Sequence, residues 1–418
     1  MKKILAIVIT SVACLALYAQ TYTYEEVLAL EKKVEGRENS DWAMQQPYVI
    51  MLSIDGFRYD YAERYGASNI QSIIESGVST RRMIPSFPSK TFPNHYAIVT
   101  GMYPGNNGLV SNEFYSREKD YWYNIRDKIA VTDASWYSGV PIWVLAEQHQ
   151  LLSANFFWVG SEAPIEGIYS TYSYPYTSRV ANEHRVDRIV EWLDFPEKER
   201  PHLILGYFSL VDDAGHRYGP DHENTKEAVL EIDRVIGKLL KGVEASGLPV
   251  NIVLVSDHGM VNINRGIVLP EVVDLDDAKV AYSFPPMIYQ SDSIKLEKLY
   301  NELLEVEHID VYKAAAVPDY LTFENEDCIG DLILISKAPT VIVEKPRMIS
   351  GGTHGFNPLD HQEMGAIFYA SGPSFKEGVE ISPFQNIHIY PLLAEILGLK
   401  YSHEIDGKSA VLGGILRK

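Results

Sequence analysis

Three apolar runs along the chain each lead into acidic residues. The runs YVIMLSI, HLILGYFSLV and NIVLVS are followed by Asp55, by Asp212 and Asp213, and by Asp257. A short, continuous apolar run bounded by turn residues predicts a buried β-strand. Because ligands of open parallel α/β sheets bind beyond the carboxyl ends of the strands, we expect these carboxylates to converge on one crevice.

Helical spacing appears between and after these runs. Residues 225–247 repeat apolar positions at helical spacing and stop at Gly247, which predicts a crossover helix between the second and third strands. Proline 93 and Gly101 bound a shorter predicted helix over 93–100, with Thr91 near its N-cap. There Thr91 would face free backbone N–H groups, where an anion is held and an alkoxide forms more easily. The alternative is an ordinary threonine cap.

The pattern changes in the last third of the chain. Residues 271–349 combine short apolar runs, prolines and one short helix, which suggests a small inserted subdomain. GAIFYASGPSF then predicts another buried strand and NIHIYPLLAEILGL a closing helix. We therefore expect an α/β protein whose core comprises residues 48–270 and 350–418.

The start of the chain reads as a targeting segment. Lysines 2 and 3, a short apolar run and Ala19 make residues 1–19 a predicted secretory signal peptide, followed by a polar N-terminal arm over 20–47. The sequence thus predicts a periplasmic or secreted protein without a transmembrane anchor. Lipidation at Cys14 is the less favoured alternative. Beyond the signal only Cys328 remains, so no intrachain disulfide is expected.

Composition restricts the partners. The formal net charge of −19 becomes −21 without Lys2 and Lys3, which argues against a nucleic-acid-binding surface and against an anionic membrane as partner. Divalent cations held by clustered carboxylates would still allow a phosphate ligand to bind. Solubility of a secreted protein explains the acidity equally well.

Histidines accompany the predicted strand ends. Asp212 and His216 stand four residues apart, a spacing that suits a metal chelate on one helical turn. Asp257 and His258 are adjacent, and His354 lies between glycines in GGTHGFNP. Each pattern alone is more often a solvated turn. Together they supply enough oxygen and nitrogen ligands for two zinc ions.

These motifs, in order, resemble a known family. SIDGFRYD, SKTFPNHYAIVTGMYPGNNGLVSN, WYSGVPIW, DDAGHRYGP, VSDHGM and GGTHGFNP are similar to the nucleotide pyrophosphatase/phosphodiesterase branch of the alkaline phosphatase superfamily, from about residue 48 to 378. The resemblance implies an alkaline-phosphatase-like α/β sandwich, with a central mostly parallel sheet flanked by helices. It also implies two Zn²⁺ ions per chain, one held by Asp55, Thr91, Asp257 and His258, the other by Asp212, His216 and His354.

The resemblance assigns further roles. Thr91 would be the nucleophile that forms a phosphothreonyl intermediate, and Asn112, with the Phe92 backbone N–H, would donate to a non-bridging phosphate oxygen. Phe92 and Tyr207 would sandwich a nucleobase. Beyond what the resemblance assigns, Tyr172, Tyr174 and Tyr176 are candidates for a further wall of the base pocket, and the alternative is that they are ordinary core or surface residues.

The predicted activity is hydrolysis of small nucleotide phosphodiesters and pyrophosphates to nucleoside monophosphates. A choline or lysophospholipid phosphodiesterase and a phosphomonoesterase are alternatives on the same scaffold. A monoesterase needs an additional cation near the phosphate, and Lys90 and Arg81 are the candidates closest in sequence. A non-catalytic, metal-stabilised binding protein is the remaining alternative, although it would have no need of Thr91. The sequence leaves the oligomeric state open.

Overall fold

A computed structural model describes residues 21–417, and a central sheet of nine strands forms its largest element. Its middle strands β8, β7, β9, β2 and β10 are parallel, because helical crossovers connect them. Strand β19 enters antiparallel between β10 and β3, and β1 is antiparallel to β8. In sheet order the strands are β1 (Lys32–Lys33), β8 (Tyr172–Tyr174), β7 (Ser153–Phe156), β9 (Leu203–Phe208), β2 (Tyr48–Ile54), β10 (Val250–Val255), β19 (Phe368–Ser371), β3 (Val78–Thr80) and β20 (Val379–Ile381).

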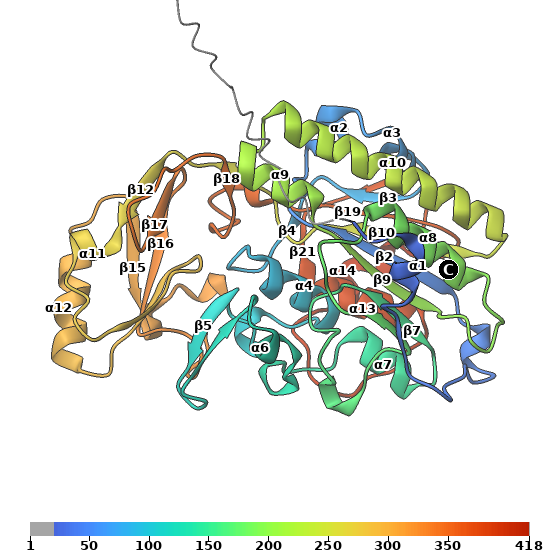
Figure 1. Cartoon of the computed structure of the whole chain (residues 1–418), viewed down its shortest axis with the longest axis horizontal. Coiled ribbons are helices and arrows are strands. Elements are labelled where there is room, and N and C mark those ends of the chain that lie inside the picture. The colour runs from blue at the N-terminus through green and yellow to red at the C-terminus, as the bar shows by residue number, and fades with distance from the viewer. Residues whose placement is uncertain (1–20, 418) are drawn as a thin grey trace, which may run out of the picture.

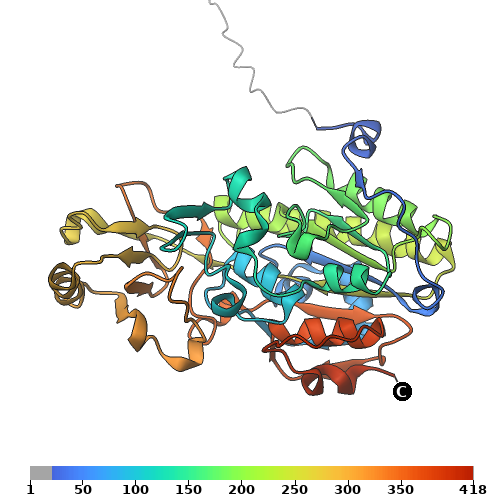
Figure 2. The same cartoon turned by 90° about the horizontal axis from the view of Figure 1, so that it is seen from below.

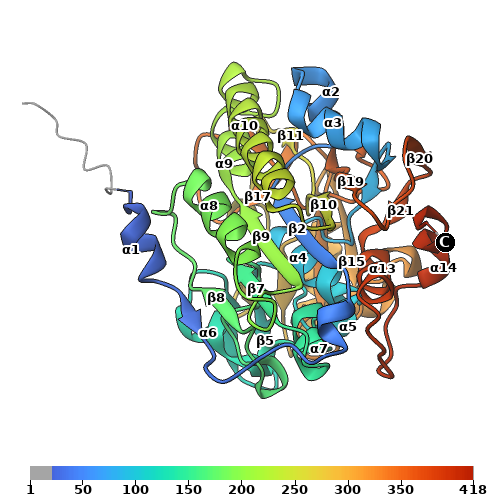
Figure 3. The ribbon, with the colours of Figure 1, turned by 90° about the vertical axis from the view of Figure 1, so that its right-hand side faces the viewer.

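Helices cover both faces of this sheet (Figure 3). Alternate residues of β2 face opposite sides, so that Ile50 and Leu52 pack in one apolar cluster while Val49 and Met51 pack in the other. The first cluster lies under α2 (Tyr61–Tyr65), α3 (Ser68–Ser76), α8 (Asn182–Leu193) and α10 (Glu223–Ser246); the second lies under α4 (Thr91–Thr100), α7 (Ile142–Gln148) and α13 (Ile389–Ile396). The predicted α/β sandwich with a mostly parallel sheet is confirmed.

A separate lobe stands beside the core (Figures 1 and 2). It has its own apolar cluster, which includes Leu269, Leu299 and Leu334. Strand β12 lies before residue 271 in the chain, but it pairs with β17 of the lobe. The limits of the inserted subdomain, residues 271 and 349, therefore stay a prediction. The elements of the lobe are β12 (Arg265–Val268), α11 (Leu269–Val272), β13 (Lys279–Ala281), β14 (Met287–Tyr289), α12 (Ser293–Leu303), β15 (Ile309–Lys313), β16 (Leu332–Ser336) and β17 (Thr340–Val343).

A hairpin of β5 (Glu113–Ser116) and β6 (Tyr121–Asn124) joins this lobe to the core. Arg117 at its turn donates to the carbonyls of Glu326, Asp327 and Ile329 and pairs with Asp331. One guanidinium thus fixes the hairpin to the lobe. The short elements that complete the fold are α1 (Tyr24–Leu28), β4 (Met83–Ile84), α5 (Pro104–Asn107), α6 (Lys128–Thr132), α9 (Leu210–Tyr218), β11 (Val261–Asn262), β18 (Gly352–Thr353), β21 (Phe384–Gln385) and α14 (Ser409–Leu412).

Several local expectations need correction. The helix α4 begins at Thr91, two residues before the predicted start at residue 93, so Thr91 is its first residue and Lys90 is the N-cap. Asp212 and Asp213 do not end a strand; β9 stops at Phe208 and both acids lie in the first turn of α9. The arm over 20–47 supplies edge strand β1, and its Glu31 pairs with Arg188.

The expected signal peptide, with Cys14, lies outside the described residues. No helix within residues 21–417 is long and apolar enough to cross a membrane.

Candidate active site

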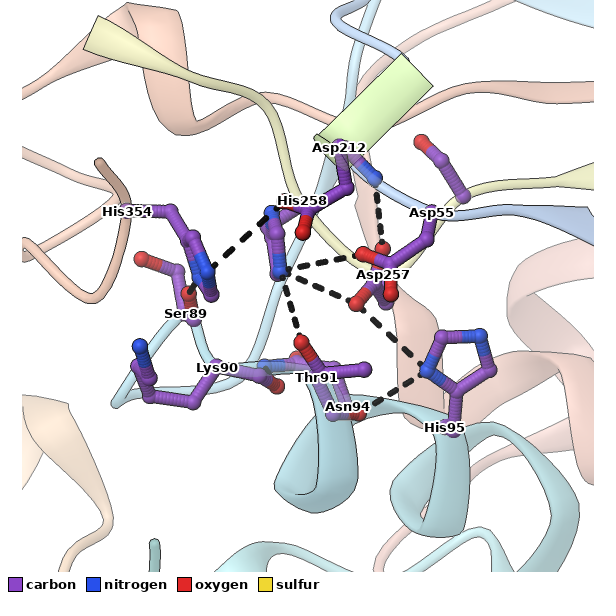
Figure 4. A network of polar contacts seen from close by, with 12 residues as sticks. Asp55, Ser89, Lys90, Thr91, Asn94, His95, Asp212, Asp257, His258 and His354 are labelled. Atoms are coloured by element: carbon purple, nitrogen blue, oxygen red, sulfur yellow. Dashed lines mark hydrogen bonds and ion pairs between the residues drawn. The ribbon is translucent and has the colours of Figure 1, made fainter. Parts of the chain in front are cut away.

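The first cluster of potential ligands forms where β2 and β10 end. The parallel register pairs Ser53 with Val255, so the loops that follow the two strands leave the sheet side by side. The imidazole Nε2 of His258 lies 3.0 Å from Asp257 Oδ2 and 3.4 Å from Asp55 Oδ1. It also lies 3.4 Å from the hydroxyl of Thr91 (Figure 4). All four predicted ligands of the first zinc therefore meet, and their side chains are buried.

The second cluster joins α9 to the loop that follows β18. His216 Nε2 lies 3.5 Å from Asp212 Oδ2, because residues four apart share one face of the helix. His354 Nε2 lies 3.8 Å from Asp212 Oδ1 and 3.2 Å from His216 Nε2. One ligand atom from each of the three residues lies within 4.8 Å of the others.

Backbone contacts orient the three histidines. The Nδ1 atoms of His216, His258 and His354 lie 2.8–2.9 Å from the carbonyls of Gly352, Gly259 and Ser89. A carbonyl only accepts, so each Nδ1 carries the proton and each Nε2 presents a lone pair to its cluster. Two lone pairs facing each other at 3.2 Å, as on His216 and His354, repel unless a cation lies between them.

The carboxylates of the two clusters also have buried oxygen atoms that lack a partner. Asp55 Oδ1, Asp212 Oδ1 and Asp257 Oδ2 are buried and have no hydrogen-bond partner. Burial raises the pKa of Asp55 well above its ordinary value, and the neighbouring Asp257 and Asp212 add to the shift. Divalent cations would satisfy these oxygens, so the donor set fits two metal ions.

Thr91 sits at the positive end of α4 and is 9% exposed. The Phe92 backbone N–H donates to Asn112 Oδ1 at 3.0 Å. This backbone N–H therefore positions Asn112, and its expected donation to the substrate stays a prediction. Because Asn112 Oδ1 accepts this bond, its Nδ2 group is the one that can donate, and donation to a phosphate oxygen stays a prediction.

His95 completes the shell around the first cluster, and the sequence reasoning missed it. Its Nδ1 lies 2.9 Å from the Thr91 carbonyl and 3.4 Å from Asp257 Oδ2, while Nε2 lies 2.7 Å from Ser53 Oγ. Burial lowers the pKa of His95, which favours the neutral ring. Its position one helical turn after Thr91 was the available signal.

Of the two cations close to Thr91 in sequence, only Lys90 reaches the site. Burial lowers the pKa of Lys90 to about 8, against the attraction of Asp212 and Asp55. Arg81 points away and pairs with Glu380 on the surface. Of these two residues, Lys90 is therefore the candidate for the additional cation that a phosphomonoesterase needs near the phosphate.

Comparison with known proteins agrees with this geometry. The family profile "Type I phosphodiesterase / nucleotide pyrophosphatase" matches residues 49–357, a stretch that includes all seven predicted ligands. The chain belongs to this family. It is 36% identical to an uncharacterized pyrophosphatase/phosphodiesterase of Schizosaccharomyces pombe, over 88% of this chain and 80% of that protein.

Animal members of the family are also similar. Mouse ectonucleotide pyrophosphatase/phosphodiesterase family member 1 is 32% identical over 90% of this chain, which spans only 43% of that longer protein. The structure of mouse ectonucleotide pyrophosphatase/phosphodiesterase 5, an inactive variant in complex with AMP, superposes with a TM-score of 0.84 at 26% identity. That match covers 89% of this chain and all of the other.

The aromatic residues expected to bind substrate divide into two groups. Phe92 is partly exposed beside Thr91, and Tyr207 is 9% exposed and donates its hydroxyl to Asp55 Oδ2 at 2.6 Å. Tyr174 is fully buried and stacks on Phe156, so its assignment to the substrate pocket is wrong. Tyr176 is 43% exposed and its ring lies 6.2 Å from that of Tyr207, which makes it the tyrosine of this segment that reaches the site.

Proposed function

We propose that this family member is a two-zinc phosphodiesterase and pyrophosphatase that releases nucleoside monophosphates through a phosphothreonyl intermediate. The observation that carries the proposal is the Thr91 hydroxyl, 3.4 Å from His258 and next to two groups of potential metal ligands whose carboxylates include buried oxygens without a hydrogen-bond partner. A binding protein would need the groups but not the hydroxyl. The names of the relatives and the AMP complex of the mouse structure support a nucleotide substrate.

Nitrogen and oxygen donors of this kind suit zinc. Asp55, Asp257, His258 and Thr91 would hold one ion, and Asp212, His216 and His354 the other. When bound, the two ions would lower the pKa of the Thr91 hydroxyl and stabilise the charge on the leaving oxygen.

The residues of the chain would then act in sequence. The Thr91 hydroxyl loses its proton to solvent, and Oγ forms a bond to phosphorus as the bond to the leaving oxygen breaks; the leaving group keeps that electron pair. Asn112 Nδ2 donates to a non-bridging oxygen, a contact worth about 3 kcal/mol in the transition state. Water then breaks the Thr91–phosphorus bond, which restores the hydroxyl and releases the nucleoside monophosphate.

Steady-state kinetics on zinc-loaded protein test the proposal. We expect a nitrophenyl ester of a nucleoside monophosphate to have a higher kcat/KM than nitrophenyl phosphate or a phosphocholine ester, and a chelator to abolish turnover of all three. Thr91→Ala serves as the control for contaminating activity. A higher kcat/KM for the monoester would identify a phosphomonoesterase, and a higher kcat/KM for the choline ester would identify a choline phosphodiesterase. Turnover without metal would refute the bimetallic site.

We also propose that the mature protein is periplasmic or secreted. The proposal rests on the signal-like sequence of residues 1–19. N-terminal sequencing of the protein recovered from the native cells tests it. A chain that keeps Met1 and fractionates with the cytoplasm would contradict it.

A further inference from the structure

Ser89 is fully buried and lies two residues before the proposed nucleophile Thr91. Its hydroxyl donates to the Phe356 carbonyl at 2.7 Å and accepts from the Gly355 backbone N–H at 3.1 Å. Its own backbone carbonyl lies 2.8 Å from Nδ1 of His354, which donates to it. One residue of the nucleophile's segment therefore bonds to three consecutive residues of the loop that follows β18.

The segment that carries Ser89 is fixed to helix α4. Asn94, in the first turn of this helix, donates from Nδ2 to the carbonyls of Pro88 and Lys90 at 2.9 Å and 2.8 Å. Figure 4 shows Ser89 beside His354, in the segment that leads into α4. The helix therefore sets the position of Ser89, and Ser89 connects the helix to the His354 loop.

The His354 loop is rich in glycine, so its order depends on such connections. Gly355 has a φ of +113°, and a Cβ at this position would lie 2.7 Å from the ring of Phe284. Glycine loses more conformational freedom on ordering than any other residue. The loop must nevertheless hold His354 Nε2 toward the other two ligands of its group, His216 Nε2 at 3.2 Å and Asp212 Oδ1 at 3.8 Å.

We propose that Ser89 is a positioning residue whose hydroxyl holds residues 354–356 so that His354 is ready to bind the second metal ion. The inference rests on the proposed function. A loop that is ordered before the ion arrives loses less conformational entropy on binding, which raises the affinity. Groups that orient metal ligands typically contribute 10-fold to 100-fold in metal affinity. Because Ser89→Ala keeps the carbonyl that accepts from His354, we expect a loss of about tenfold.

Zinc titration of Ser89→Ala against a competing chelator tests the inference. One of the two dissociation constants should rise about tenfold, and the other should stay within about twofold of wild type. A His216→Ala background assigns the change, because it already breaks the second ligand group. Adding Ser89→Ala to that background should leave the affinity for the remaining ion unchanged. An equal rise in both dissociation constants, or a rise in neither, would overturn the inference.

Kinetics separate an effect on the metal from an effect on Thr91 itself. Excess zinc should return kcat of Ser89→Ala to within about twofold of wild type, and KM for a nucleotide ester should change no more than that, because the hydroxyl acts through the ion. A kcat that stays low with two zinc ions bound would place the loss at Thr91 and overturn the inference. Wild-type protein that binds two zinc ions but hydrolyses no ester would refute the proposed function, whereas the titration would still decide the role of Ser89.

Ser86→Ala is the matched control. Ser86 also precedes α4, is 1% exposed, and donates its hydroxyl at 2.8 Å to Asn386 Oδ1, which belongs to neither ligand group. Both variants lose a buried hydroxyl and should unfold at a lower urea concentration, but only Ser89→Ala should bind the second ion more weakly. A similar loss of zinc affinity in Ser86→Ala would show a general effect of destabilisation and contradict the positioning role.

Wild-type protein offers a test that needs no variant. Coupling between two equilibria is reciprocal, so zinc must stabilise the bonds to Ser89 by the factor by which those bonds favour zinc. Hydrogen exchange of the Gly355 N–H, which donates to Ser89 Oγ, should therefore slow about tenfold when zinc is added to the metal-free protein. Exchange at Gly355 that zinc leaves unchanged would overturn the inference.

Discussion

Tyr207 is assigned to nucleobase stacking by resemblance, yet its hydroxyl donates to Asp55 Oδ2 at 2.6 Å. The substitution Tyr207→Phe separates these roles, because it keeps the ring and removes only the hydroxyl. A hydrogen bond to a charged group contributes about 1.5 to 3 kcal/mol. Since Asp55 is buried and its other oxygen has no partner, water cannot replace the lost donor without rearrangement. We expect zinc affinity at the first cluster to fall about 10-fold to 100-fold.

The assay is a zinc titration against a competing chelator, followed by kinetics at saturating zinc. KM for a nucleotide ester should stay close to wild type at saturating zinc, since the ring remains. Tyr174→Phe is the matched control, because it removes a hydroxyl from the neighbouring core and should leave zinc affinity unchanged. Zinc affinity of Tyr207→Phe within twofold of wild type would refute the positioning role, and a large rise in KM would show that the hydroxyl contacts substrate.

Three further outcomes are expected. Thr91→Ala should abolish diester hydrolysis while most zinc stays bound, as measured by kinetics and elemental analysis; turnover within tenfold of wild type would exclude a covalent step at Thr91. Phe92→Ala and Tyr176→Ala should raise KM for nucleotide esters more than for methyl nitrophenyl phosphate, and equal effects would identify both rings as packing. The metal-free protein should lose stability as pH falls below about 6.5, the ordinary pKa of histidine in an unfolded chain, because the unfolded state then takes up protons on several histidines that the native state keeps neutral; the raised pKa of the single buried carboxyl of Asp55 offsets only part of this loss. The histidines whose pKa burial lowers include His95, His202 and His354. Urea unfolding at pH 7.5 and pH 5.5 measures the loss, and equal free energies of unfolding at the two pH values would contradict the prediction.

Four of the predicted ligands follow local patterns in the sequence, whereas the full set of seven and its division into two sites came from the family resemblance. Asp55 and Asp257 directly follow apolar runs that form the strands β2 and β10, and the spacing of Asp212 and His216 fits one turn of α9. What the sequence does not specify is which strands become neighbours. The pairing of Ser53 with Tyr207 across β2 and β9 brings the Tyr207 hydroxyl to Asp55, and it joins residues far apart in the chain.

The tyrosines of residues 172–176 show a second limit. Tyr172, Tyr174 and Tyr176 are two residues apart, so a strand through all three would place them on one face. Strand β8 ends at Tyr174, and only Tyr176 leaves the sheet to stand beside Tyr207. Periodicity gave the shared face but neither the end of the strand nor the side on which the core lies.

The position of β19 has a consequence for biosynthesis. Strand β3 is made early, but its partners in the sheet are β19 and β20, which the ribosome makes close to the end of the chain. His354 is likewise a late residue, and it must join Asp212 and His216 before the second group of ligands exists. A nascent chain therefore carries an unpaired strand and an incomplete chelate until synthesis is nearly finished, and tight metal retention reports that the whole core has assembled.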